Sequence, residues 1–124
     1  MEYTIRDARP EDMEQVLSLV QELANYEKEP DAVEITKEDL VKHGFGDQRM
    51  FHCFVADTQD GIAGIALVYP RYSTWKGPAI HLEDLIVLER MRGSGLGTAL
   101  LDEVVKYGNS LGVKRICWEV LDWN

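Results

Sequence analysis

The spacing of apolar side chains divides the chain into helical and extended segments. Apolar residues recur every three or four positions between residues 10 and 26, which predicts an amphipathic helix whose inner face carries Met13, Val16, Leu17, Val20, Leu23 and Ala24. The same spacing predicts a helix over residues 95–110, with Gly112 as its stop and with Leu96, Leu100, Leu101, Val104 and Val105 facing inward. Thr36 followed by Asp39 resembles a capping box, so we expect a short helix there that ends at Gly44.

Continuous apolar runs without helical spacing predict five strands. They cover residues 3–6, 51–56, 62–69, 79–88 and 113–121. Asp60-Gly61 is a strong hairpin turn, Gly64 is a candidate bulge, and residues 70–78 are expected to form a loop rich in aromatic and polar groups. The order β-α-α-β-β-β-α-β, with one hairpin and one β-α-β unit, predicts a mixed sheet with helices on its faces, an α/β (α+β) fold.

A glycine-rich stretch, residues 92–98, connects the fourth predicted strand to the last predicted helix. Glycine lets the backbone approach a ligand closely, and the first N–H groups of a helix attract anions, so this turn suits a phosphate. Arg92 can add a charged contact. The spacing matches neither the dinucleotide fingerprint nor a Walker loop, and a simple tight turn before a helix remains the alternative.

Length and charge narrow the class of protein. The chain of 124 residues fits one domain, residues 1–124, and its 45% hydrophobic content suits a globular fold. It has no apolar run of membrane-spanning length and no signal peptide, and Cys53 and Cys117 lie in apolar runs typical of buried thiols, so we expect a cytoplasmic protein. The net charge of −9 argues against a nucleic-acid partner. It suits a cationic amine substrate through steering, although solubility alone is the more common reason for such a charge.

Residues 82–87 followed by Arg-x-x-Gly-x-Gly resemble the cofactor strand and pyrophosphate loop of the GNAT family of N-acetyltransferases. Further segments resemble its diamine acetyltransferase branch, which includes spermidine/spermine and thialysine acetyltransferases. These are residues 23–28, 43–47, 51–56, 72–77, 82–84 and 120–124, so the similarity extends over essentially the whole chain.

The resemblance implies the GNAT fold, acetyl-CoA as cofactor, a homodimer, and a set of site residues. For the cofactor it implies the backbone of Leu85, Ile86 and Val87, the loop Arg92, Gly93, Ser94, Gly95, Leu96, Gly97 and Thr98, and Asn124. For the substrate it implies Tyr26, Glu27, Glu83, Cys117, Trp118 and Glu119.

Glu83 is the candidate general base, because an ammonium group must lose a proton before its nitrogen can attack a thioester. Simple pairing with a cation is the alternative for Glu83 and for Asp84, which points to the other face of the strand unless a bulge intervenes. Glu27 and Glu119 can hold the far cationic end of a diamine, and Trp75 can wall the amine site by cation–π contact. His43, His52 and His81 show no metal-binding spacing and are interpreted as structural, and no metal is expected.

Two departures from the branch bear on function. Polyamine-specific relatives carry Asp two places before the loop tryptophan, where this chain has Ser73, which favours a thialysine-like or lysine-like amine. After Trp-Asn the family continues with a helix bearing the tyrosine taken as general acid and with a final strand, whereas this sequence ends at Asn124, so we expect a C-terminally incomplete domain. The sequence thus predicts acetyl transfer to a small diamine, polyamine, or thialysine- or lysine-like amine. A non-catalytic CoA-binding module or inactive fragment and, more weakly, acetylation of a protein lysine or N-terminus remain the alternatives.

Overall fold

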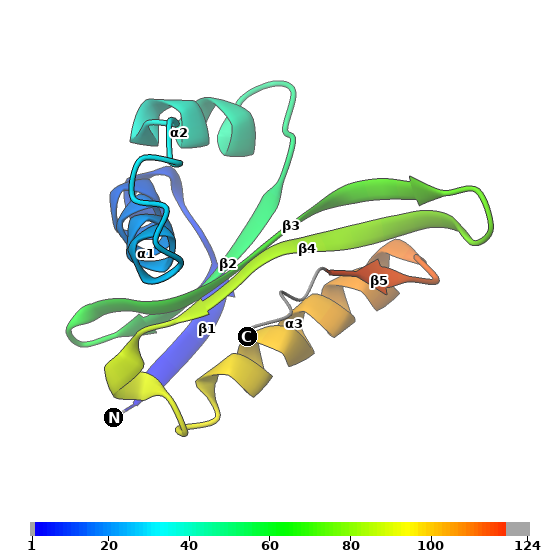
Figure 1. The fold of residues 1–124 in the computed structure, drawn as a ribbon. Coiled ribbons are helices and arrows are strands. Elements are labelled where there is room, and N and C mark those ends of the chain that lie inside the picture. The colour runs from blue at the N-terminus through cyan, green and yellow to red at the C-terminus, as the bar shows by residue number, and fades with distance from the viewer. Residues whose placement is uncertain (1, 119–124) are drawn as a thin grey trace.

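A computed structural model of the chain describes residues 2–118. A five-stranded sheet carries helices on both faces (Figure 1). Its strands are β1 (Tyr3–Asp7), β2 (His52–Thr58), β3 (Gly61–Ser73), β4 (Gly77–Val87) and β5 (Ile116–Cys117). The helices are α1 (Met13–Tyr26), α2 (Lys37–Phe45) and α3 (Leu96–Leu111), and two short 3₁₀ turns, η1 (Pro10–Asp12) and η2 (Glu89–Met91), precede α1 and α3.

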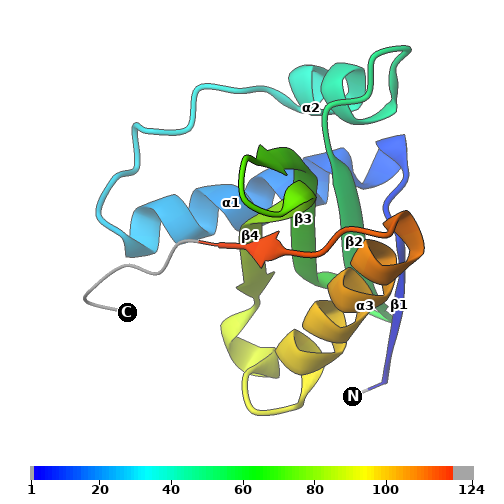
Figure 2. The same cartoon turned by 90° about the vertical axis from the view of Figure 1, so that its right-hand side faces the viewer.

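The strands lie in the order β1-β2-β3-β4-β5. The first four pair antiparallel, and β4 pairs with β5 in parallel, which confirms the predicted mixed sheet. From the end of β4, α3 runs back along the sheet, so that β5 follows beside the outer half of β4 (Figures 1 and 2). The elements β4, α3 and β5 are thus arranged as a parallel β-α-β unit.

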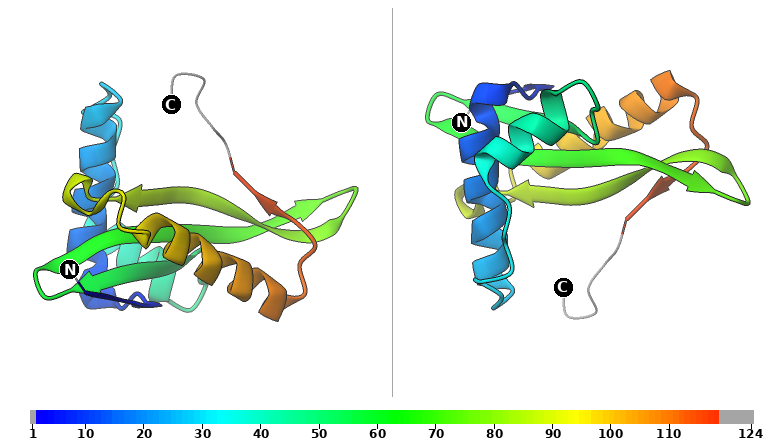
Figure 3. Two further views of the ribbon diagram at one scale, coloured as in Figure 1. Left: turned by 90° about the horizontal axis from the view of Figure 1, so that it is seen from below. Right: turned by 90° about the horizontal axis from the view of Figure 1, so that it is seen from above.

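Two apolar cores hold the layers together, one on each face of the sheet. Figure 3 shows the helices that cover these faces, with α1 and α2 on one side of the sheet and α3 on the other. The first core lies under α1 and α2 and contains Met13, Val16, Leu19, Leu40, Cys53, Val55, Ile65, Leu67 and Ile86. The second lies under α3 and contains Phe54, Ala66, Val68, Ile80, Leu82, Leu96, Leu100 and Val104. Both predicted helix faces are thus broadly confirmed, but Val105, expected to face inward, is 41% exposed because the buried stripe of α3 passes through Val104 instead.

The segment predicted as a loop, residues 70–78, is mostly strand. β3 continues to Ser73 and β4 begins at Gly77, so only residues 74–76 form the turn. Pro70 and Pro78 suggested a loop because proline cannot donate a ladder hydrogen bond. The β2–β3 pairing ends at His52 and Val68, so beyond it β3 pairs with β4 alone and has one free edge within the described residues, which tolerates proline.

The capping box at the start of α2 is confirmed. Thr36 Oγ1 accepts from the Asp39 amide (3.1 Å), and the Asp39 carboxylate accepts from the Thr36 amide (2.9 Å). The predicted stop at Gly44 is wrong, because the helix runs on to Phe45 and ends at Gly46. Gly44 instead allows close packing: a Cβ there would lie 2.4 Å from the ring of Phe51.

Candidate active site

The glycine-rich turn has the geometry of an anion site. Gly93 and Gly95 have φ values of 80° and 86°, a left-handed conformation that other residues rarely adopt. A Cβ at either position would meet nothing within 4 Å, so the space beside both backbones is open. Gly95 is the N-cap of α3 and supplies no side-chain cap, and the first turn of α3 carries no acidic residue. The amides and dipole of this 16-residue helix therefore favour a bound anion such as a pyrophosphate.

Close packing fixes the position of this turn against the sheet. A Cβ on Gly64 would lie 2.6 Å from Leu96 Cδ2 and 3.0 Å from the carbonyl oxygen of Ile86, so only glycine lets the first turn of α3 approach β3 so closely. Gly64 also adjoins the irregularity between β2 and β3, since Ala56 opposes Gly64 while Asp57 opposes Ile62. The bulge expected near Gly64 is thus present, with Ala63 as the extra residue.

Within residues 2–118, the edge of β4 is open between the turn and β5. In the part of the chain that the structure describes, β4 pairs with β5 only through Ile80–Ile116 and His81–Cys117. Residues 82–87, which include the predicted cofactor strand Leu85, Ile86 and Val87, have no β5 partner there. An open strand edge next to a turn that favours an anion can receive an extended ligand that carries amide groups.

A bulge in β4 determines where its two carboxylates lie. Asp84 opposes Leu67 and Leu82 opposes Val68, so Glu83 is an extra residue between them. Leu67 belongs to the core under α1 and Leu82 to the core under α3, which places Asp84 on the α1 side. In a regular strand Glu83 and Asp84 would face opposite sides, whereas the bulge brings both toward the same site.

Glu27 from the end of α1 joins these two carboxylates. Burial, together with the negative charges of Glu83 and Glu27, raises the pKa of Asp84 to about 6. Glu83 itself has a side chain that is 54% exposed and therefore reachable by a ligand. The negative charges of Glu83 and Glu27 both act on Asp84, so this part of β4 favours a cation.

His81 lies beside Glu83 and is the part of the site that the sequence did not reveal. It is 6% exposed, its Nε2 is 3.9 Å from Glu83 Oε1, and its Nδ1 is 3.3 Å from Arg71 Nη1. Arg71 lies ten positions earlier, in the segment expected to be a loop, so its proximity became apparent only from the hairpin register. The register, in which Tyr69 opposes His81, cannot be predicted from local sequence patterns, so the Arg71–His81 contact could not be predicted either.

Other predicted substrate residues are less close to Glu83. The backbone of Cys117 pairs with His81, two residues before Glu83. Trp75 is 88% exposed in the turn of the β3–β4 hairpin, and Gly77 and Glu83 are six positions apart in the strand, about 20 Å. Tyr26 and Trp118 are largely exposed. Glu119 and Asn124 lie outside the described residues.

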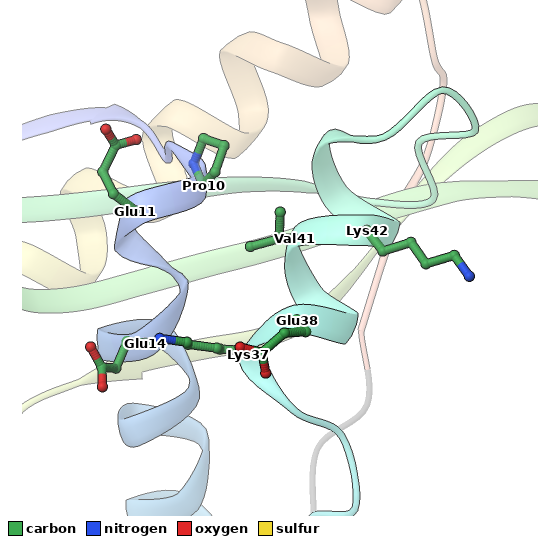
Figure 4. Close-up of a pocket in the computed structure, with 7 residues that line it drawn as sticks. All are labelled: Pro10, Glu11, Glu14, Lys37, Glu38, Val41 and Lys42. Atoms are coloured by element: carbon green, nitrogen blue, oxygen red, sulfur yellow. The ribbon is translucent and has the colours of Figure 1, made fainter.

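Two further features of the described residues bear on ligand binding, a hollow between α1 and α2 and the distribution of possible metal ligands. A hollow of about 520 Å³ separates the start of α1 from α2, where Lys37 extends toward α1 and Lys42 points away (Figure 4). None of the predicted site residues lines it. Among residues 2–118, no three His, Cys, Asp or Glu side chains are grouped as metal ligands, both cysteines are free thiols, and no helix is long and apolar enough to cross a bilayer.

Comparison with known proteins identifies the family. The model of the acetyltransferase (GNAT) family matches residues 12–124. The chain belongs to this family. It is 38% identical to the thialysine N-epsilon-acetyltransferase of Bos taurus, over 97% of this chain and 75% of that protein. It is 32% identical to the human spermidine/spermine N(1)-acetyltransferase-like protein 1, over 98% of this chain but 19% of that protein.

These similarities confirm that the GNAT domain is an N-acetyltransferase that matches the diamine acetyltransferase branch. The fold agrees: an acetyltransferase from Trypanosoma brucei superposes with a TM-score of 0.78 at 22% identity, over 98% of this chain and 85% of that structure. The chain thus spans about three quarters of the length of the thialysine acetyltransferase that it matches.

Proposed function

We propose that this protein transfers an acetyl group from acetyl-CoA to the amine of a small cationic substrate. The observation that carries the proposal is that Glu83 and Asp84 lie together at the β4 bulge, where the charge of Glu27 also acts on Asp84, beside a strand edge that leads to the glycine-rich turn. A cation and an anionic cofactor would thus meet at one point on β4. The net charge of −9 supports the attraction of a cationic substrate from solution.

The residues present fit acetyl-CoA. The left-handed Gly93 and Gly95 leave space for a pyrophosphate at the start of α3, and Arg92 is exposed beside them. The backbone of Leu85, Ile86 and Val87 can pair with the amides of the pantetheine arm. The rest of the pyrophosphate cradle would be formed by Ser94, Leu96, Gly97 and Thr98. Asn124 remains a proposed cofactor contact on the basis of the family resemblance. When bound, acetyl-CoA supplies an acetyl group activated as a thioester.

Glu83 is the residue that we assign as general base. An amine is protonated at neutral pH and cannot attack until a proton leaves its nitrogen, and the half-exposed Glu83 carboxylate can accept that proton directly or through water. Asp84 and Glu27 would hold the positive charge of the substrate. Backbone N–H groups at the open edge of β4 can stabilise the negative charge that develops on the acetyl oxygen.

For the substrate we propose a thialysine-like or lysine-like amine over a long polyamine. The curated relative at 38% identity is named for thialysine, and Ser73 stands where polyamine-specific relatives carry a carboxylate. Tyr26, Cys117, Trp118 and Glu119 remain proposed substrate contacts, and Trp75 remains one at the hairpin turn. We further propose that residues 1–124 act as a single domain and that the protein functions as a homodimer, which light scattering tests directly.

The decisive experiment measures coenzyme A release and coenzyme A binding side by side. Thialysine, lysine, spermidine and a lysine peptide are offered in parallel, and calorimetry measures coenzyme A binding to the same preparation. Turnover with one small amine that is lost in Glu83→Gln while coenzyme A still binds supports the proposal. Binding without turnover by any amine supports a coenzyme A-binding module instead, and absence of both overturns the assigned cofactor site.

A further inference from the structure

His81 is held between two groups of opposite charge in the middle of β4. Arg71 Nη1 lies 3.3 Å from its Nδ1, and Glu83 Oε1 lies 3.9 Å from its Nε2. The ring packs against Tyr69 with a centroid distance of 5.1 Å and is almost fully buried. Its orientation is therefore fixed from three sides.

Arg71 determines which ring nitrogen of His81 carries the proton. A guanidinium group only donates hydrogen bonds, so Nδ1 must be the acceptor and the proton of the neutral ring must be on Nε2. A second proton on Nδ1 would place an N–H donor against the guanidinium. The ring thus directs a neutral Nε2–H donor at the Glu83 carboxylate.

We propose that His81 is a positioning residue for Glu83 and that Arg71 sets its tautomer. The inference rests on the role of Glu83 in the proposed function. The 3.9 Å separation exceeds a hydrogen bond, but a small rotation of the half-exposed Glu83 side chain closes it. A neutral donor favours the ionised form of the Glu83 carboxylate and fixes its orientation. It lowers the basicity of the carboxylate less than a cationic partner would.

Among residues 2–118, charged and titratable groups reach the surroundings of His81 from four elements. β3 contributes Arg71 and Tyr69, β4 contributes Glu83 and Asp84, β5 contributes Cys117, and α1 contributes Glu27, whose charge acts on Asp84. His81 presents a neutral donor to Glu83. Removing it should therefore affect the Glu83 carboxylate specifically.

The chain contains a matched control in His52. Its Nδ1 is 3.2 Å from Arg49 Nη2, its Nε2 is 3.2 Å from Asp7 Oδ1, and its ring stacks on Tyr107 at 4.5 Å. The arrangement repeats that of His81, with an arginine, a carboxylate and an aromatic ring. Asp7 lies in β1, at the opposite edge of the sheet from β5, so His52→Phe removes the same kind of contact away from the candidate site.

The first test is structural and needs no turnover. Imidazole ¹⁵N spectra of the three histidines, assigned with His81→Phe and His52→Phe, should show His81 protonated on Nε2 alone. Its Nε2 signal should move with pH as Glu83 ionises, and Glu83→Gln should remove that movement. Arg71→Met should mix the two tautomers. A His81 protonated on Nδ1, or an Nε2 signal unaffected by Glu83→Gln, overturns the proposal.

The second test is kinetic. His81→Phe should lower kcat about tenfold and move the acid limb of the kcat profile to higher pH, because a charged acceptor loses one donor. His81→Gln, which keeps an N–H donor, should restore part of the rate and also covers the case that His81→Phe does not fold. His52→Phe should leave the profile unchanged. A wild-type profile in folded His81→Phe overturns the inference, whereas full activity in Glu83→Gln overturns the general-base assignment instead.

Discussion

Arg6 on β1 and Asp12 at the start of the first helical segment form a two-pronged ion pair. Arg6 Nη1 lies 2.8 Å from Asp12 Oδ2, and Nη2 lies 3.1 Å from Oδ1. The Asp12 side chain is 8% exposed and also accepts from the Arg9 amide, so its charge is balanced by donors on two sides. This pair connects the edge strand to the helix whose far end carries Glu27.

Arg6→Met should lower the free energy of unfolding by about 3 kcal/mol, because it leaves the buried Asp12 carboxylate without its ionic partner. Urea unfolding at pH 7 measures the loss. The matched control is Asp57→Asn, since Asp57 is the second partner of Arg6 but is 40% exposed, and its loss should cost less than about 1 kcal/mol. Equal losses in the two variants would contradict the assigned importance of burial.

The same ion pair predicts a weakness in acid. Hydrogen bonding to Arg6 holds the pKa of Asp12 below its ordinary value, so the folded state binds this proton less readily than the unfolded chain. The stabilisation is complete above the ordinary aspartate pKa and is lost as pH falls through the lowered one. Wild-type protein should therefore lose stability below about pH 4 more steeply than Arg6→Met. Parallel slopes in urea titrations would refute this.

Asp84 predicts the opposite pH dependence. Burial raises its pKa to about 6, so between about pH 4 and pH 6 the folded state holds a proton that the unfolded chain has released. Stability should fall as pH rises through that window, by up to about 3 kcal/mol. Asp84→Asn should remove the fall and raise the melting temperature at pH 8, while it weakens binding of a cationic amine. Asp102→Asn, on the exposed side of α3, should change neither property.

The fold was largely predictable because it depends on local patterns. The apolar spacing around Met13 and Leu100, the Thr36 cap and the Asp60-Gly61 turn each specify an element from nearby residues alone. The candidate site was harder to predict from the sequence. The insertion of Glu83 between Leu82 and Asp84 depends on the register against Leu67 and Val68, which no local pattern encodes. The Arg71–His81 contact depends on the length of the β3–β4 hairpin, which the sequence underestimates because Pro70 and Pro78 suggest a loop.

Gly64 in β3, which packs against the first turn of α3, and Gly97 within that turn separate packing from binding. Gly64→Ala should cost about 2 kcal/mol in unfolding free energy, since its Cβ would overlap Leu96 Cδ2 at 2.6 Å and the Ile86 carbonyl oxygen at 3.0 Å. Gly97→Ala should be neutral or slightly stabilising, because its Cβ would meet only Val87 Cγ2 at an ordinary 3.6 Å and alanine favours a helix.

For coenzyme A binding we expect the opposite order, with Gly97→Ala more harmful than Gly64→Ala. If the first turn of α3 receives the pyrophosphate, the methyl group of Gly97→Ala occupies space that the ligand needs, and coenzyme A affinity should fall about tenfold in a protein of undiminished stability. Urea unfolding and calorimetric titration of the same samples measure both quantities. Unchanged affinity in Gly97→Ala would remove Gly97 from the cradle, and a loss of stability equal to that of Gly64→Ala would show that the space beside Gly97 serves packing.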